Sequence, residues 1–462
     1  MGTVHGIHCK IPHPPSGQKG GMRHPLRAKG RYKMINRRDF IKKVALGGAA
    51  ASMLGRIGTG PDFFSAQEAH ASERNRLVFL SDVHLGAVAD YAPTSEHLVE
   101  LTAFLKHLNQ RTDVAELVLL GDIFDDWVFP VEEPPLAFTA ILDAPHNASV
   151  IAALRDVCNN PDIQTTYVTG NHDLLSWEEE NRQAIAATFP GIAIRSDAPG
   201  LGFYSKDDVI WAEHGHRYSL FNAPDIWSHE GSHLPLGYFI SRLYTSKSVT
   251  DHWMYSPDDI LHTLLKDTAE SLNRTRKGLP PYWAGPGTEG IVDDALIVAL
   301  FNAMALWAGK RPRDRFTMNG KDGFQRNPMV ERVAFLYDTI FSQWPARQNI
   351  VTKLTAFMND LEKMVATAEL LLMMPERIRP LYPFAPRIVL FGHTHQPCLF
   401  FHGQGKGRIY ANTGTWVDEK PMTWVEIEVT NPNDTQRSYR TELWYYNEDQ
   451  PRQFATILVD NG

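Results

Sequence analysis

Five short polar clusters in the 462-residue sequence each follow an apolar run, and their side chains are of types that bind metal ions. They are Asp82-Val83-His84, Gly121-Asp122-Ile123-Phe124-Asp125, Gly170-Asn171-His172-Asp173, His214-Gly215-His216 and Gly392-His393-Thr394-His395. Carboxylate, imidazole and carboxamide groups together suit divalent metals such as Mn, Fe, Zn or Co, and the sequence does not select among these. Side chains two residues apart lie on the same side of an extended chain, which predicts that Asp82 and His84 converge. Asp122 has two carboxylate oxygens and could bridge two ions.

Each cluster has an ordinary structural interpretation when it is taken alone. The Gly-Asn-His-Asp sequence could form a turn, and His214 and His216 could be a surface pair. Asp122 and Asp125 could cap the start of a helix. The occurrence of all five clusters, each at the end of an apolar run, favours a shared metal site.

Short apolar runs alternate with helical patterns around these clusters. Strands are predicted at 77–80, 117–120, 165–169, 209–212 and 388–391, with further strands at 408–411, 424–429 and 440–446. Residues 97–109 and 151–158 carry apolar side chains at helical spacing. This alternation predicts an α/β fold, in which ligands collect where strands end.

The pattern becomes mainly helical between residues 217 and 380. Helices are predicted over 257–274, 289–307, 329–344 and 350–374. The simplest organisation is one α/β domain, formed by 72–216 and 381–462, that is interrupted by a helical insertion over 217–380.

The five clusters resemble, in order, the signature of the calcineurin-like metallophosphoesterase superfamily: D-x-H, G-D-x-x-D, G-N-H-D/E, H and G-H-x-H. The resemblance covers the α/β parts of the chain. It implies a four-layer α/β/β/α sandwich, which here carries a large helical insertion. It also implies a metal-dependent phosphoric ester hydrolase, in which a hydroxide bridging two divalent metals attacks a phosphomonoester, phosphodiester or pyrophosphate.

The resemblance carries residue roles onto the matching positions. One metal would be held by Asp82, His84, Asp122 and His395, and the other by Asp122, Asn171, His214 and His393. His172 would protonate the leaving oxygen, and Asp173 would orient His172. The role of His216 stays open between support of the site, substrate contact and plain surface.

Two features bear on the branch of the superfamily. Purple acid phosphatases carry a Tyr ligand where this sequence has Asp125, so an iron–tyrosinate site is not expected. The segments around Asp122 and His393 are similar to UDP-diacylglucosamine pyrophosphatases, which hold acyl chains in a helical insertion, although that branch has Arg at the position of His172. An envelope lipid or nucleotide-sugar pyrophosphatase is therefore one alternative, and a non-catalytic metal-binding scaffold is another.

Apolar side chains in the insertion leave the question of lipid contact open. They are Leu264, Leu265, Leu296, Phe301, Trp307, Phe357 and Leu370. These residues could line an acyl pocket, or they could pack the helices together, as helical apolar stripes usually do.

The N-terminal region has the pattern of a leader. Residues 1–33 are rich in Gly, Pro and basic residues, which predicts disorder or a start codon assigned too early, with Met34 as the true start. Residues 34–71 place paired Arg37 and Arg38 before a short apolar stretch and Ala69-His70-Ala71, which resembles a twin-arginine export signal. A basic amphipathic helix is the alternative. The resemblance implies the Tat export machinery as a partner and a periplasmic or secreted protein.

Charge is divided unevenly between this leader and the remaining chain. The formal net charge is −7, of which residues 1–71 contribute +9 and the remaining residues −16. An acidic body argues against a nucleic-acid-binding protein, which needs a basic face. Three cysteines, Cys9, Cys158 and Cys398, are too few for a disulfide scaffold, although Cys158 and Cys398 could pair after export.

Overall fold

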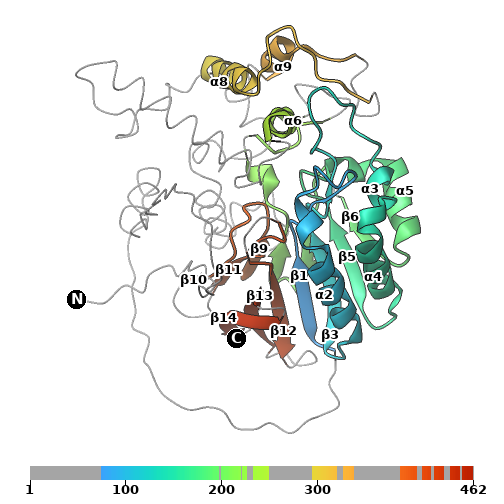
Figure 1. Ribbon diagram of the computed structural model, residues 1–462. Coiled ribbons are helices and arrows are strands. Elements are labelled where there is room, and N and C mark those ends of the chain that lie inside the picture. The colour runs from blue at the N-terminus through green and yellow to red at the C-terminus, as the bar shows by residue number, and fades with distance from the viewer. Residues whose placement is uncertain are drawn as a thin grey trace, which may run out of the picture. The chain divides into compact units, whose positions relative to one another are not determined.

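The structure is a computed structural model that describes residues 74–196, 199–219, 221–225, 233–248, 294–319, 326–337, 386–402, 408–417, 421–430, 437–447 and 450–460 (Figure 1). All of them belong to the compact unit Phe64–Gly462. The predicted leader, comprising 1–33 and 34–71, lies outside these ranges, as do the predicted helices 257–274 and 350–374. None of the helices in the described ranges has the length and apolar character needed to cross a bilayer.

Two β-sheets form the framework that carries the polar clusters. The strands are β1 (Arg76–Leu80), β2 (Leu85–Gly86), β3 (Val114–Leu120), β4 (Phe124–Asp125), β5 (Gln164–Val168), β6 (Ala193–Arg195), β7 (Tyr204–Lys206), β8 (Ile210–Ala212), β9 (Ile388–Phe391), β10 (Cys398–His402), β11 (Arg408–Asn412), β12 (Thr423–Thr430), β13 (Ser438–Asn447) and β14 (Gln450–Asp460). Within the described residues one sheet has seven strands in the order β14-β13-β12-β1-β3-β5-β6, and the other has five in the order β10-β11-β9-β8-β7.

Both sheets combine segments from before and after the helical insertion. Strand β1 pairs in parallel with β3 and antiparallel with β12, and β8 pairs in parallel with β9. Strands β1, β3 and β5 run parallel to one another, so their carboxyl ends meet at one edge. The same holds for β8 and β9 in the second sheet.

Helices flank the seven-stranded sheet and extend into the insertion. They are α2 (Leu98–Gln110), α3 (Thr139–Leu142), α4 (Ala148–Asn159), α5 (Glu179–Thr188), α6 (Leu236–Ser248), α8 (Asp294–Trp307) and α9 (Val330–Leu336), with short 3-10 helices η1 (Pro93–Glu96), η2 (Pro145–Asn147), η3 (Leu174–Trp177) and η4 (His216–Tyr218). Helix α2 forms because Leu101, Phe104, Leu105 and Leu108 recur at helical spacing and are all buried.

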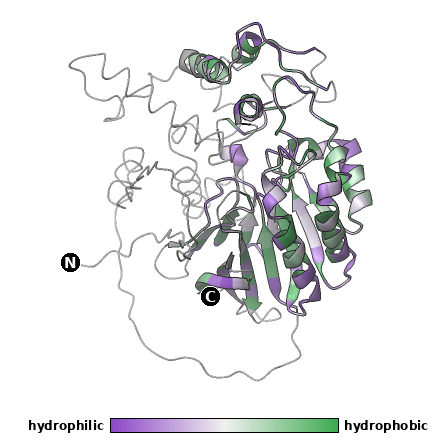
Figure 2. Ribbon diagram, in the orientation of Figure 1, coloured by the Kyte–Doolittle hydropathy of each residue, from purple (hydrophilic) through white to green (hydrophobic). Residues whose placement is uncertain are grey.

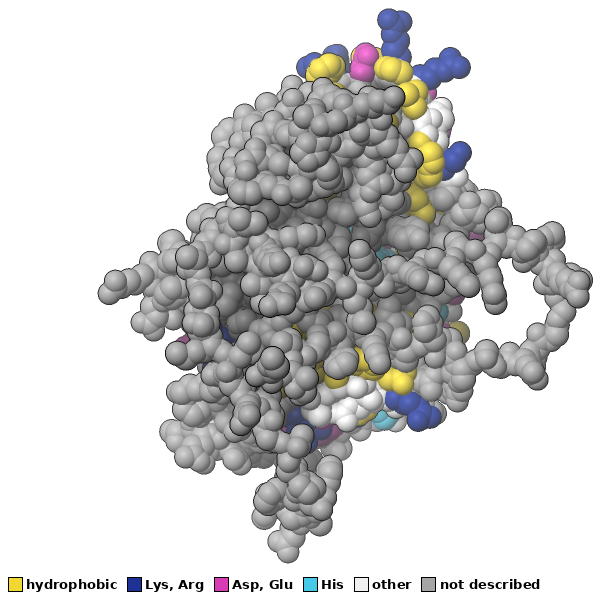
Figure 3. Space-filling model, turned by 90° about the vertical axis from the view of Figure 1, so that its left-hand side faces the viewer, with side chains coloured by type: hydrophobic (Ala, Val, Ile, Leu, Met, Phe, Trp, Pro, Cys, Tyr) yellow, Lys and Arg dark blue, Asp and Glu magenta, His cyan; other side chains and the backbone are white. Residues whose placement is uncertain are grey.

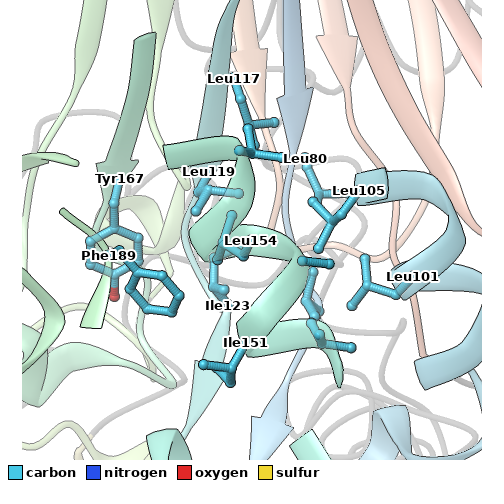
Figure 4. Packing of buried hydrophobic residues seen from close by; sticks show 14 of the residues in the cluster. Leu80, Leu101, Leu105, Leu117, Leu119, Ile123, Ile151, Leu154, Tyr167 and Phe189 are labelled. Carbon is cyan, nitrogen blue, oxygen red and sulfur yellow. The ribbon is translucent and has the colours of Figure 1, made fainter. Parts of the chain in front are cut away.

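The alternation of side chains along each central strand divides the core into two layers. Leu77 and Phe79 of β1 pack between the two sheets against residues such as Ile210 and Ile388. Val78 and Leu80 of β1 point the other way, against the flanking helices, because successive side chains of a strand face opposite sides. Figure 4 shows this second layer, in which Leu80 lies beside Leu105 of α2. Figure 2 shows the matching pattern, with largely hydrophobic strands beside helices of mixed hydropathy.

The helices of the insertion build their own apolar core. It joins Phe239 of α6, Phe301 of α8 and Val333 of α9, and it includes Trp127 from the sandwich. Phe301 is buried in this core, so the packing interpretation is confirmed for that residue, whereas Trp307 is 46% exposed. The side chains of Leu264, Leu265, Leu296, Phe357 and Leu370 lie outside the description.

The predicted α/β class and most predicted elements are confirmed, including the strand at 388–391, which is β9. Apart from the 3-10 helices, nine described elements were not predicted: the strands β2, β4, β6, β7, β10 and β14 and the helices α3, α5 and α6. Helix α5 has only Asn181 and Ile185 buried, so it has no apolar stripe, and α6 contains a glycine and a buried arginine. Tyr218 of η4 packs with buried side chains of the five-stranded sheet. The fourth layer of the predicted α/β/β/α sandwich, a layer of helices on this sheet, stays a prediction.

Candidate metal centre

The five polar clusters meet at the carboxyl ends of strands from both sheets. Asp82 and His84 follow β1, and Asp122 follows β3. Asn171 and His172 follow β5, His214 follows β8, and the cluster with His393 and His395 follows β9. The seven predicted ligands and His172 come together at this edge, and all are buried except His395, whose side chain is 14% exposed.

One group of potential metal ligands consists of Asp82, His84 and His395, whose ligand atoms all lie within 4.8 Å of one another. The two Nε2 atoms of His84 and His395 are 3.1 Å apart. His395 Nε2 is 3.2 Å from Oδ1 of Asp82. This is the set, together with Asp122, that the resemblance assigns to the first ion.

A second group consists of Asp122, His214 and His393, whose ligand atoms also lie within 4.8 Å of one another. His214 Nε2 is 3.0 Å from Asp122 Oδ2 and 3.1 Å from Asn171 Oδ1. Asp122 Oδ2 also lies 3.8 Å from Nε2 of His84 in the first group. Asp122 therefore stands between the two groups, where a bridging ligand has to be.

In His84 and His214, one ring nitrogen is used in a hydrogen bond and the other faces the remaining candidate metal ligands. His84 Nδ1 lies 2.9 Å from Asp125 Oδ2, and His214 Nδ1 lies 2.9 Å from the carbonyl of Leu120. Since each Nδ1–H donates to an oxygen acceptor, each Nε2 presents a lone pair in the neutral ring. Histidines that bind metals usually have this arrangement, with the second nitrogen bonded to a carboxylate or carbonyl. The residues present therefore fit two cations.

The backbone at these positions is not extended, contrary to the prediction that an extended chain points the paired side chains together. Asp82, His84 and Asp122 have φ of 53°, 54° and 52°, and His393 and His395 have φ of 68° and 53°. Left-handed backbone is uncommon for residues with a side chain and is retained where the surroundings fix it, often at functional sites. The side chains do converge, but by sharp turns at the strand ends.

Two motif glycines are required because site side chains lie directly against their Cα atoms. A methyl group at Gly121, whose φ is +83°, would lie 2.6 Å from Cγ of His214. A methyl group at Gly170 would overlap Oδ1 of Asp122. The glycines of G-D and G-N-H thus make room for the ligands of the neighbouring strand.

His172 is held by Asp125 rather than by Asp173, so the predicted orienting role of Asp173 is wrong. His172 Nδ1 lies 2.9 Å from Asp125 Oδ2, the oxygen that also contacts His84. Burial alone would raise the pKa of Asp125, but the charges and hydrogen bonds of His172 and His84 lower it. Asp125 is thus an ionised carboxylate that fixes both imidazoles, a role that the sequence analysis missed.

Asp173 instead organises the backbone of two site loops. It accepts hydrogen bonds from the amides of Gly170 (2.6 Å) and Ile123 (2.9 Å). Burial, followed by the charge of Asp122, raises the pKa of Asp173 to about 6. Asp173 lies behind the ligands and ties the loop after β5 to the loop after β3.

His216, whose role was left open, and Glu213 beside His214 both have structural partners. His216 is buried, and its Nε2 lies 2.7 Å from the carbonyl of Gly200, so the plain-surface interpretation is wrong. Glu213 accepts hydrogen bonds from Trp211 Nε1 (3.0 Å) and from the hydroxyl of Tyr218 (2.5 Å). Both residues support the loop that carries His214.

Two further residues near the site were not predicted. Trp127 stacks on His172, with ring centroids 4.4 Å apart. Asn222, just inside the insertion, places Nδ2 3.4 Å from Nε2 of His393. Trp127 stands at the end of the segment around Asp122 that carries the branch resemblance, but no role was predicted for it, and Asn222 lies in no motif. Their closeness in space relates both residues to the site. Cys158 and Cys398 are buried in different apolar clusters and form no disulfide in this structure.

Metal binding is expected to tighten as the pH rises from about 6.5 to 9. Burial would lower the pKa of His84 and His214, but neighbouring carboxylates raise both values to about 9. Protonated imidazoles stabilise the metal-free fold fully below pH 6.5, and this contribution is lost as the pH rises through 9. A metal must displace these protons, so affinity should rise by roughly tenfold per pH unit for each proton released.

Calorimetric metal titrations at several pH values check this expectation. Repeating them in buffers of different ionisation enthalpy counts the protons released per ion. An affinity that stays constant between pH 6.5 and 8.5 would contradict the assignment of these imidazoles as ligands.

Comparison with known proteins gives a family match for part of the chain. Residues 75–274 match the family model of the calcineurin-like phosphoesterases. The matched range contains the clusters from Asp82 to His214, while the cluster at 392–395 lies beyond it. No curated protein matches the sequence. Among solved structures, a dimetal phosphatase from Danio rerio is similar at 10% sequence identity and a TM-score of 0.28, over 84% of this chain and 99% of that chain.

Proposed function

We propose that this protein is a dinuclear-metal phosphoesterase. The observation that carries the proposal is the pair of adjoining ligand groups with Asp122 between them and a histidine, His172, at their edge. One ion would be held by Asp82, His84, Asp122 and His395, and the other by Asp122, Asn171, His214 and His393. When bound, two such ions polarise a phosphoryl group and lower the pKa of water between them.

The protein side chains supply orientation and a proton. Asp125 holds Nδ1 of His172, which leaves Nε2 to carry the proton that the leaving oxygen needs. The side chain of His172 is 9% exposed, more than those of Asp82, His84, Asp122 or His214. His172 and His395 therefore mark the edge that a substrate reaches first.

The net negative charge of the chain limits the classes of substrate and partner that we propose. The body after residue 71 has a net charge of −16, so it does not attract polyanions from a distance, and no nucleic-acid partner is proposed. The positive charge that binds phosphate is local to the metal centre. A compact phosphomonoester, phosphodiester or pyrophosphate fits such a site.

A substrate panel tests this function directly. Metal-free protein is reconstituted separately with Mn, Fe, Zn and Co and assayed with p-nitrophenyl phosphate, bis-p-nitrophenyl phosphate, a nucleotide-sugar pyrophosphate and a phospholipid. Turnover of at least one of them is expected, with loss on chelation and recovery on metal addition. Binding of two metals without turnover of any of these compounds would instead favour the non-catalytic scaffold.

Exposed apolar residues on the insertion favour keeping lipid substrates in that panel. Leu306 and Trp307 of α8 and Phe335 of α9 are exposed. Figure 3 shows hydrophobic side chains next to Lys and Arg side chains on the described surface. Preferred turnover of the lipid or nucleotide-sugar compound would support the envelope pyrophosphatase alternative.

The export proposal rests on the leader sequence alone. We propose that residues 34–71 direct the protein through the Tat machinery and are removed, which gives a periplasmic or secreted enzyme. N-terminal sequencing of the native protein should find a start after Ala71. Peptides from residues 1–33 in the native protein would contradict Met34 as the start.

A further inference from the structure

We propose that helix α6 of the insertion positions His172, acting through Trp127, so that the insertion is part of the catalytic site. This inference rests on the proposed function, because it assigns a support to the proposed acid. Trp127 and Arg242 are positioning residues in this account, and neither contributes an atom to the metal ligands.

The first step is the contact between Trp127 and the imidazole. The two rings are stacked with centroids 4.4 Å apart and an interplanar angle of 30°. The edge of the same imidazole is bonded to Asp125 at 2.9 Å. A single hydrogen bond to Asp125 leaves the ring free to turn and the bond free to open transiently. A flat surface against one face of the ring limits both motions, so it keeps the Nδ1–H bond closed and fixes the direction of Nε2.

The second step is that Trp127 packs with the insertion. It belongs to the apolar core that contains Tyr238, Phe239 and Leu243 of α6, and it is fully buried there. Its ring meets the ring of Tyr238 edge-on, with centroids 5.9 Å apart and an interplanar angle of 90°. Trp127 thus lies between the imidazole on one side and helix α6 on the other.

The third step is the way in which α6 holds the segment after Trp127. Arg242 is fully buried and donates to the carbonyls of Phe129 (3.3 Å), Pro130 (2.8 Å), Val131 (3.3 Å) and Glu133 (2.6 Å). The amide of Val131 donates to Ser246 Oγ, also on α6, at 2.7 Å. Helix α6 therefore holds the backbone directly after Trp127 at several consecutive residues.

The fourth step is the burial of the Arg242 charge, which is energetically unfavourable. A buried guanidinium is normally paired with a carboxylate, yet the described contacts of Arg242 are carbonyls, the Tyr238 hydroxyl, the Met318 sulfur and two aromatic faces. Its rigid fork of donors matches several carbonyls at once, which a lysine could not do. The buried charge thus serves to fix one loop, the one that begins with the residue stacked on His172.

The test compares variants that keep an apolar filling at position 127. Trp127→Leu removes the flat surface, and Trp127→Phe retains it. Arg242→Met releases the loop without a polar replacement. Trp424→Leu, the same change at a buried tryptophan of β12 in a different core, is the matched control.

The first readout needs no activity. In metal-free protein labelled with 15N-histidine, the Nδ1–H resonances of His172 and His84 both report hydrogen bonds to Asp125, and His172→Ala assigns the former. Trp127→Leu and Arg242→Met are expected to lose the His172 resonance by fast exchange and to keep that of His84. Trp127→Phe and Trp424→Leu are expected to keep both. Retention of the His172 resonance in Trp127→Leu would overturn the inference.

The second readout is the dependence of turnover on the leaving group. A poor leaving group needs the acid more than p-nitrophenolate does, so Trp127→Leu should raise the ratio of p-nitrophenyl phosphate to alkyl phosphate turnover about tenfold or more. An unchanged ratio would overturn the inference while wild-type turnover upholds the proposed function. If the wild type has no turnover, the proposed function fails, and the resonances alone decide the positioning.

Discussion

Replacing Asp122 by asparagine is expected to weaken metal binding at both positions and to remove nearly all turnover. Asp122 lies against His214 of one group and 3.8 Å from His84 of the other, and its second oxygen accepts the amide of His172 at 2.8 Å. Partners outside the coordination shell typically change metal affinity about 10–100-fold. A shared direct ligand should therefore cost at least about 100-fold at each position.

Metal content per chain, measured by mass spectrometry after dialysis, checks this expectation together with turnover. Asparagine keeps the shape of the side chain and its acceptor oxygen, so the fold should persist. Asp143→Asn, on an exposed residue after α3, is the matched control and should retain two ions. Two ions and full activity in Asp122→Asn would contradict the bridging role.

Replacing His172 by alanine is expected to lower turnover of alkyl phosphates by about 10²–10⁴-fold, with both metals retained. His172 is not among the predicted ligands, although its ring meets that of the ligand His84 edge-on with centroids 4.7 Å apart. Asp125, which bonds His84, stays in place in this variant. The loss should be much smaller for p-nitrophenyl esters, because their leaving oxygen departs without a proton. Asp125→Asn should lower turnover too, but it should also weaken metal binding, because Asp125 holds the ligand His84.

Steady-state kinetics across leaving groups of rising pKa separate these cases. His107→Ala, an exposed histidine of α2, provides the control and should leave the slope unchanged. Equal losses for good and poor leaving groups in His172→Ala would show that His172 positions the substrate rather than donating a proton.

The sequence predicted the five polar clusters because the types and positions of their residues follow from local rules. Apolar runs mark strands such as β1, β3 and β9, and polar residues directly after such strands meet at one edge of an α/β fold. The resemblance to metallophosphoesterases then selected seven of their residues as candidate ligands and divided these into two sets. The structure groups the same side chains, with Asp122 between the sets. Local sequence patterns were therefore sufficient to locate these polar clusters.

Which carboxylate holds His172 depended on the tertiary structure. Asp173 is next to His172 in sequence, yet its carboxylate turns back to the amides of Gly170 and Ile123. Asp125 follows a different strand and reaches His172 only because β3 and β5 are neighbours in the sheet. Adjacency in sequence says little about direction where the backbone turns sharply, as the positive φ of Asp82 and Asp122 illustrates.

The sequence by itself thus determined which side chains with metal-binding chemistry follow the strand ends, because ligand chemistry is a property of residue type and strand ends are visible as patterns. The tertiary structure alone decided how the side chains of the site are oriented and which residues hold them. No role for Trp127 or Arg242 was predicted from the sequence. Their proposed importance comes from a helix more than 100 residues further along the chain that packs against the loop after Asp125. Such long-range packing follows from how apolar surfaces fit together, which no local pattern encodes.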